Sequence, residues 1–140
     1  MQLQIQKIHP DAKLPTFAHD TDAGMDLYAL ETVTIGSQKR VTFRTGIALA
    51  VPEGYVGLIW DKSSIAHKRG LKSLGGVVDA GYRGEVFVGL FNTGLDVQVV
   101  HAGDKVAQLL LQKIEHPELI EVDSLDETPR GGGAFGSTGA

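Results

Sequence analysis

The sequence has 140 residues, 42% of them hydrophobic and 21% charged, so it fits one domain that can bury a sizeable core. Its formal net charge of −4 gives no general electrostatic case for binding nucleic acid or a membrane surface. The absence of cysteine excludes disulfides and thiolate chemistry. No apolar run approaches the roughly 20 residues that span a bilayer, and the first eight residues do not resemble a signal peptide, so we expect a cytoplasmic protein.

Short runs of β-branched and apolar residues, separated by glycine and proline turns, follow one another along most of the chain. Alternation of side chains between two faces is typical of a half-buried strand. The pattern predicts strands over residues 3–8, 41–51, 55–60, 85–91, 97–100 and 106–114. The last of these also fits a helical period, although its neighbours favour a strand. One short helix is predicted over Ser63–Arg69, where a serine can cap the first turn and Gly70 can end the helix.

Evenly spaced short strands with almost no helical periodicity predict an all-β fold, a single-domain antiparallel jelly roll or β-sandwich with one short helix. Composition changes after Glu127, where Pro129 separates a compact domain over residues 1–128 from a glycine-rich C-terminal arm over residues 129–140. Because glycine loses much conformational freedom on ordering, we expect this arm to be flexible. It also carries a guanidinium, an aromatic ring and two hydroxyls, which suit a phosphate and a flat base, although a plain solubilising tail would have a similar composition.

Asp79 is a candidate for acid–base chemistry. It follows the apolar pair Val77 and Val78, which should be buried, so its carboxylate can be oriented toward a water molecule. A hairpin turn from Asp79 to Gly81 would explain the same residues. Residues 61–64 offer a cation and hydroxyls beside the predicted helix start, where phosphate oxygens are favoured, although a simple N-cap explains them equally well. Two weaker clusters are residues 103–105 with the nearby Gln108, and residues 23–26.

Taken in order, five segments of the chain resemble the five sequence motifs of the trimeric dUTP pyrophosphatase (dUTPase) family. They are residues 23–29, 62–70, 76–85, 103–109 and the glycine-rich arm, so the resemblance extends from about residue 23 to residue 139. It implies a dUTPase-like β-clip form of the jelly roll, and hydrolysis of dUTP to dUMP and pyrophosphate by attack of water on the α-phosphate. This reaction limits the incorporation of uracil into DNA and supplies dUMP for dTMP synthesis.

The resemblance also implies roles for individual residues. Asp79 is expected to be the general base, and Asp26 to hold a Mg²⁺ ion through water while phosphate oxygens and waters supply most of the metal's ligands. The α- and β-phosphates are expected to meet Ser63, Ser64 and Gln108, with Lys62 adding positive charge. The arm is expected to close on the γ-phosphate and to stack on uracil, through Arg130, Phe135, Gly136, Ser137 and Thr138.

Uracil is expected to enter a β-hairpin over about residues 74–78, whose backbone groups copy a Watson–Crick edge. The hairpin residues concerned are Leu74, Gly75, Gly76 and Val78. Tyr82 is expected to lie under the deoxyribose and to exclude a 2′-hydroxyl. The resemblance further implies a homotrimer whose active sites are shared between subunits, so that a monomer would be inactive. Neither nucleic acid nor a membrane is an expected partner.

Four positions depart from the family pattern, and one of them is Gly81, which replaces the second acidic residue of the commoner third motif and leaves Asp79 as the only carboxylate in that turn. Lys62 stands where arginine is usual, so a point charge replaces bidentate phosphate recognition. Ser73 stands near a usual asparagine that contacts the base, and Ala134 stands where the arm usually has a glycine, which restricts closure.

Two alternatives remain. A dCTP deaminase, alone or bifunctional, needs a glutamate that would align with Gly89. A non-catalytic nucleotide-binding or protein-interaction module on the same fold would tolerate the loss of Asp79.

Overall fold

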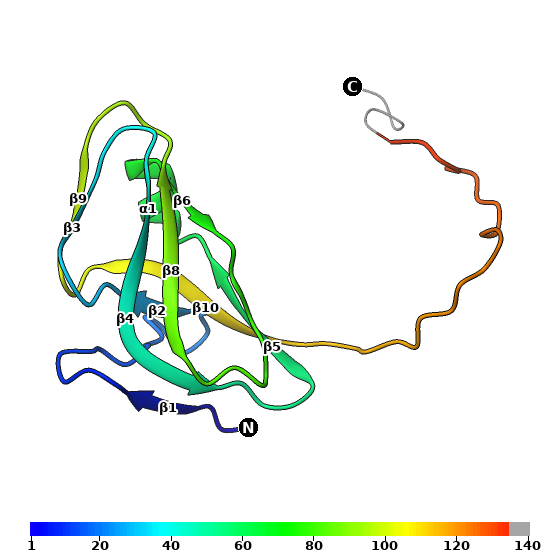
Figure 1. The fold of residues 1–140 in the computed structure, drawn as a ribbon, viewed down its shortest axis with the longest axis horizontal. Helices are drawn as coiled ribbons and strands as arrows, with labels where there is room; N and C mark the ends of the chain where they lie inside the picture. The colour runs from blue at the N-terminus through cyan, green and yellow to red at the C-terminus, as the bar shows by residue number, and fades with distance from the viewer. Residues whose placement is uncertain (135–140) are drawn as a thin grey trace.

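The computed structural model describes residues 1–134 (Figure 1). Its strands are β1 (Gln4–Lys7), β2 (Met25–Tyr28), β3 (Val33–Ile35), β4 (Arg40–Ala50), β5 (Tyr55–Trp60), β6 (Leu71–Leu74), β7 (Val77–Val78), β8 (Glu85–Asn92), β9 (Gln98–Val100) and β10 (Lys105–Lys113). The helix α1 (Ser63–Arg69) lies between β5 and β6 in the chain. Two four-stranded sheets, in the orders β1-β4-β8-β6 and β2-β10-β5-β7, accompany the two-stranded sheet β3-β9. Every strand pair is antiparallel, which confirms the predicted all-β class.

One hydrophobic core joins the sheets, and β8 shows how residues reach it. Val86, Val88 and Leu90 are buried, whereas Phe87 between them is 45% exposed. Because successive side chains of a strand point to opposite faces, one face of this sheet covers the core and the other face is left open. The sheet that contains β10 contributes to the same core through Leu27, Val78, Ala107 and Leu109.

The eleven-residue strand β4 serves two neighbours because it bends in its middle. Residues 40–44 pair with β8, and residues 47–50 pair with β1. At the bend Gly46 has a φ of +68°, and its N–H donates to Glu85 Oε1 at 2.8 Å. A Cβ at this position would lie 2.8 Å from Ala12 Cβ, so glycine is required both by conformation and by space.

The structure corrects the sequence analysis in several details. The ambiguous segment over residues 106–114 is a strand, β10, whereas the sequence pattern does not predict β2, β3 and β6, because three or four residues show too few alternations. The helix bounds are confirmed, and Gly70 ends α1 in the left-handed region at a φ of +63°. The expected serine cap is wrong, since the N-cap residue is Lys62 and it makes no side-chain capping hydrogen bond.

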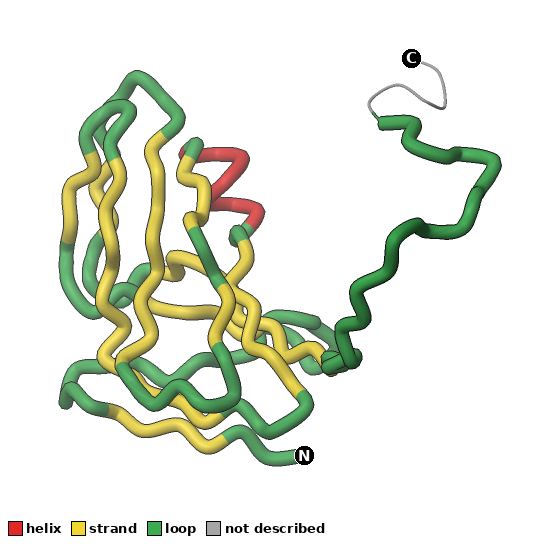
Figure 2. Tube along the Cα trace, turned by 45° about the vertical axis from the view of Figure 1, so that its right-hand side comes forward, coloured by secondary structure: helices red, strands yellow, loops and turns green. Residues whose placement is uncertain are grey.

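After β10 the chain leaves the sheets and extends away from them (Figures 1 and 2). All side chains over residues 115–134 are exposed, including Leu119 at 91% and Leu125 at 84%. The last strand ends at Lys113, and the domain boundary between residues 128 and 129 stays a prediction. Among the described residues, no helix has the length and apolar character needed to cross a bilayer.

Candidate active site

A buried carboxylate lies between two lysines where three segments of the chain meet. Asp26 on β2 is only 3% exposed. Lys62, just before α1, donates to Asp26 Oδ1 at 2.7 Å. The Nζ of Lys105, at the start of β10, lies 2.6 Å from Asp26 Oδ2, so these two groups form an ion pair. Three of the five motif segments therefore converge on one group, called below the Asp26 cluster: Asp26, Lys62, Lys105 and Gln108.

Sheet register explains why these segments meet. β10 is an inner strand that pairs with β2 on one side and with β5 on the other. Gln108 on β10 lies opposite Asp26 on β2 and opposite Trp60 on β5. Because β5 ends at Trp60, Lys62 follows two residues later at the same end of the sheet.

The charges in the Asp26 cluster stabilise one another. Burial raises the pKa of Asp26, but hydrogen bonds and charges from Lys105 and Lys62 outweigh burial and hold that pKa below its usual value. The hydrogen bond and charge of Asp26 in turn raise the pKa of Lys105. At neutral pH the carboxylate and two ammonium groups therefore carry a net charge of +1, which suits an anionic ligand such as phosphate.

Gln108 is oriented by Gly24, which precedes β2, and by Asp61, which follows β5. Its Nε2 donates to the backbone carbonyl of Asp61 at 2.8 Å. Its Oε1 occupies space beside Gly24, where a Cβ would lie only 2.5 Å away. A glycine at position 24 is thus needed for this orientation. Ser63 and Ser64, the first two residues of α1, are exposed, and no hydrogen bond of their hydroxyls is found over residues 1–134.

The segment expected to bind uracil does not form a hairpin of two paired strands. β6 pairs with β8 and β7 pairs with β5, so residues 74–78 cross from one sheet to the other. We call this segment the base turn. Ile59 N–H donates to Gly76 O at 2.7 Å, and a Cβ at Gly76 would lie 2.5 Å from Ile59 O. Gly75 and Gly76 have φ values of +72° and +132°, so the turn requires both glycines.

Asp79 lies directly after the base turn and is exposed. The expectation that both preceding valines are buried is half wrong: Val78 is 6% exposed but Val77 is 68% exposed. β7 has two residues, which point to opposite faces, and only one face meets the core. A turn, the alternative explanation of this segment, is present, since Tyr82 N–H donates to Asp79 O at 3.1 Å. A hollow of about 230 Å³ is lined by Asp79 and Tyr82 among others.

Tyr82 folds back over a glycine. Its hydroxyl donates to Glu85 O at 2.9 Å, and a Cβ at Gly84 would collide with the hydroxyl and ring of Tyr82. Arg83 braces the same loop, because its Nη1 donates to Ala80 O at 2.6 Å and to Tyr82 O at 2.8 Å. The phenol ring therefore has a defined place next to Asp79.

The structure does not bring every predicted site residue together in one chain. Over residues 1–134, no hydrogen bond or ion pair joins Asp79 to the Asp26 cluster. Arg130 is exposed and its Nε donates locally to Gly133 O at 3.1 Å. The remaining predicted arm residues lie outside the described residues, and they are Phe135, Gly136, Ser137 and Thr138.

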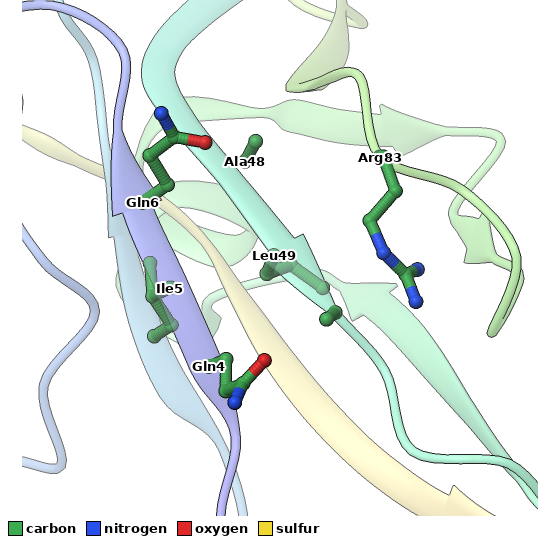
Figure 3. Close-up of a pocket in the computed structure, with 7 residues that line it drawn as sticks. Gln4, Ile5, Gln6, Ala48, Leu49 and Arg83 are labelled. Carbon is green, nitrogen blue, oxygen red and sulfur yellow. The ribbon is translucent and has the colours of Figure 1, made fainter.

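Figure 3 shows a hollow of about 250 Å³ between β1, the end of β4 and Arg83. Its lining includes Gln4, Gln6 and Leu49, and Arg83 is its one ionisable side chain. A hollow without a carboxylate or imidazole has no general base. This hollow therefore offers no group for acid–base chemistry, whereas Asp26 and Asp79 each carry a carboxylate.

The donor set decides what kind of metal site fits. Within the part of the chain that the structure describes, no three His, Cys, Asp or Glu side chains are grouped to hold a metal ion. Both oxygens of Asp26 already face lysines. Mg²⁺ commonly binds through one or two carboxylates together with substrate phosphates and water. The described residues therefore fit a metal ion that would take most of its ligands from phosphate oxygens and water.

The fold and the positive cluster define an all-β protein that suits a phosphorylated ligand. A family model described as dUTPase matches residues 10–139, and the chain belongs to this family. Two bacterial relatives are named deoxyuridine 5′-triphosphate nucleotidohydrolase. That of Thermobifida fusca (strain YX) is 44% identical over 142 residues, 99% of this chain and 79% of its own length. That of Mycobacterium leprae (strain Br4923) is 47% identical over 145 residues, 98% of this chain and 94% of its own.

Solved structures agree with this assignment. A mutant dUTPase of Staphylococcus bacteriophage 80alpha with dUpNHpp has a TM-score of 0.94 at 29% identity, and the match covers 99% of each chain. A mutant dUTPase from phage phi11 of S. aureus, whose structure concerns the coordination of a structural Mg(II) ion, has a TM-score of 0.86 at 29% identity. That match covers 91% of this chain and 100% of the phage chain. The jelly-roll prediction is thereby confirmed.

Proposed function

We propose that this member of the dUTPase family hydrolyses dUTP to dUMP and pyrophosphate with the residues described above, as a cytoplasmic homotrimer. The observation that carries the proposal is the convergence of three motif segments on Asp26, in a chain that matches the family model over residues 10–139. The protein is thus a dUTP diphosphatase. Deamination of dCTP finds no support, since Gly89 has no side chain to act on an amino group.

The Asp26 cluster binds the phosphates in this proposal. Lys62 and Lys105 supply positive charge, and Asp26 holds their ammonium groups in place. Ser63 and Ser64 present exposed hydroxyls beside Lys62, and Gln108 completes the set. Groups that the fold has already fixed need little reorganisation when negative charge develops during the reaction.

Asp79 is the general base. It removes a proton from a water molecule whose oxygen attacks the α-phosphorus, in line with the bond to the β-phosphate; that bond breaks and pyrophosphate leaves. Burial of Val78 anchors the exposed carboxylate that follows it. Mg²⁺ held by the phosphates, with Asp26 in its outer shell, would neutralise charge on the leaving pyrophosphate.

The base turn selects uracil through backbone N–H and C=O groups, and its two glycines permit the base to approach closely. Tyr82 lies under the deoxyribose and leaves no room for a 2′-hydroxyl. Cytosine is rejected because it would leave polar backbone groups of the base turn without partners in the closed site. In general, such unpaired groups discriminate between ligands more strongly than the loss of one methyl group from an apolar contact.

Assembly unites the parts that one chain keeps apart. A homotrimer that takes the Asp26 cluster from one subunit, Asp79 and the base turn from another, and the arm from the third would complete each site. Two observations support this arrangement: the absence of bonds between Asp79 and the Asp26 cluster over residues 1–134, and a tail that leaves the domain with exposed Leu119 and Leu125 (Figure 1).

A product assay tests the proposal. The protein is incubated with Mg²⁺ and, separately, with dUTP, dCTP, dTTP and UTP, and the products are resolved by chromatography. We expect dUMP and pyrophosphate from dUTP, with the other nucleotides at least about 10²-fold slower. In ¹⁸O-labelled water the label should enter dUMP and not pyrophosphate. Uridine nucleotides formed from dCTP, or label in pyrophosphate, would contradict the proposal.

A further inference from the structure

Asp61 lies between the two parts of the site and has no side-chain role in the mechanism above. It follows β5 and precedes Lys62, and its side chain is 23% exposed. Its Oδ1 accepts a hydrogen bond from Ser73 N–H at 2.7 Å, and its Oδ2 pairs with Lys72 Nζ. Its backbone carbonyl accepts the bond from Gln108. One residue thus contacts β6 through its side chain and β10 through its main chain.

β6 leads directly into the base turn. Ser73 is followed by Leu74, the last residue of β6, and then by Gly75 and Gly76. Two glycines at positive φ restrain a turn weakly by themselves, so its position depends on what holds its ends. One end is held by Ile59 N–H at Gly76 O. The other end is held by the pairing of β6 with β8 and also by the carboxylate of Asp61, through Ser73 and Lys72.

We propose that Asp61 is a positioning residue that fixes the entrance of the base turn, and that it thereby contributes to the selection of uracil without touching the substrate. The inference rests on the function proposed above, because it takes residues 74–78 to be the base-binding segment.

The charge of Asp61 strengthens this attachment. Burial raises the pKa of Asp61, but hydrogen bonds from Lys72 and Ser73 outweigh burial and hold the pKa below its usual value, so the group is ionised near neutral pH. A hydrogen bond to an ionised acceptor is stronger than one to a neutral acceptor. Asparagine at this position should therefore weaken the attachment, and alanine should remove it.

The two connections of Asp61 can be separated by experiment. Gln108 bonds to the backbone carbonyl, which every side-chain substitution retains. Asp61→Ala should therefore loosen the entrance of the base turn, while the pairing of β6 with β8 and the residues proposed to bind phosphate stay in place. A ligand that carries phosphates but no base, inorganic triphosphate, reports on those residues alone.

The experiment compares wild type, Asp61→Ala, Asp61→Asn and Lys72→Met. It measures KM and kcat for dUTP, the ratio of kcat/KM for dUTP over dCTP, and inhibition by inorganic triphosphate. For Asp61→Ala we expect the ratio to fall about tenfold and the dUTP KM to rise by a similar factor, because the partly buried Ser73 N–H loses its partner. Asp61→Asn and Lys72→Met should each lower the ratio about threefold. Inhibition by triphosphate should change less than twofold in all three variants.

Each outcome decides the inference. A dUTP-over-dCTP ratio within twofold of wild type in Asp61→Ala overturns it, and so does an equal loss of dUTP and triphosphate binding, which would mark a general structural role. If Asp61→Ala does not fold, Lys72→Met applies the same criterion, because it removes the ion pair without altering Asp61. Failure of the wild type to hydrolyse dUTP would instead overturn the proposed function itself, together with this inference.

Discussion

The Asp26 cluster and the base turn are built in opposite ways. The cluster is formed by side chains from β2, β10 and the residue before α1, with a buried carboxylate and two ion contacts of 2.6–2.7 Å. The base turn is formed by backbone, rests on two glycines and is followed by an exposed catalytic candidate, Asp79. The single chain thus fixes the part proposed to bind phosphate by packing and charge, whereas the part proposed to choose the base rests on turn geometry and, in the proposed trimer, on neighbouring subunits.

Asp79→Asn, directly after the base turn, should have the largest effect on catalysis. Removal of a general base should lower kcat by about 10²–10⁴-fold while dUTP still binds, because the Asp26 cluster is unaltered. Steady-state pyrophosphate release and equilibrium binding of dUTP check this expectation. Asp96→Asn, on another exposed loop, is the matched control and should keep wild-type kcat. Unchanged pyrophosphate release in Asp79→Asn would contradict the assigned base.

Removal of residues 130–140 tests the arm. Loss of Arg130 and of the residues that follow it should lower kcat by about 10²-fold, because the γ-phosphate is no longer held in position. The truncated protein should keep the mass of the full-length assembly in sedimentation, since the sheets end at Lys113. Full activity without the arm would leave its proposed role without support.

Asp26→Asn alters the Asp26 cluster and should lower the free energy of unfolding. Removing the carboxylate leaves two lysines close together beside a buried amide, which should cost about 3 kcal/mol at neutral pH. Because the pKa of Asp26 is lower in the folded than in the unfolded chain, this stabilisation is present above its usual value of 3.8 and is lost as pH falls through the lowered folded value. Urea unfolding at pH 7 and below pH 3.8 should therefore show a difference between variant and wild type that shrinks in acid.

Two glycine substitutions separate backbone strain from steric contact in the base turn. Gly75→Ala and Gly76→Ala both place a Cβ at positive φ, which costs about 1–2 kcal/mol of stability. Only Gly76→Ala adds a contact of 2.5 Å with Ile59 O, whereas nothing lies within 4 Å of a Cβ at Gly75. We therefore expect Gly76→Ala to be the less stable variant in thermal unfolding and to raise the dUTP KM more. Equal effects would show that backbone strain alone governs the turn.

Lys62→Arg should have the smallest effect, and it should strengthen the binding of dUTP. A guanidinium can contact Asp26 and a phosphate oxygen at once, so the dUTP KM should fall about two- to fivefold with little change in kcat. Titration of the variant with inorganic triphosphate should show the same gain. An unchanged KM would mean that Lys62 serves mainly to hold Asp26.

Long strands and the ordered motifs were the predictable part of this molecule. β4, β5, β8 and β10 show enough alternating residues to be recognised from the sequence, and the family resemblance identifies Asp26, Lys62 and Gln108 as candidate site residues. The structure brings those three together. The assignment of roles to them remains a proposal.

Other features depended on register, which no short pattern reveals. The contact of Lys105 with Asp26 follows from the pairing of β10 with β2, and the bond from Gln108 to Asp61 follows from the pairing of β10 with β5. Residues 74–78 have the composition of a hairpin, yet their flanking strands belong to different sheets. Contacts between strands that are distant in sequence decided each of these points.

Gly84 has a consequence for how this protein can change by mutation. Each glycine codon lies one base change away from an alanine codon. The methyl group of alanine at position 84 would collide with the ring of Tyr82, the side chain proposed to exclude a 2′-hydroxyl. If Tyr82 has that role, a single base change at another residue is enough to displace the side chain that excludes ribonucleotides. Selection against Gly84→Ala would therefore reflect the proposed role of Tyr82, although the substitution falls on a different residue.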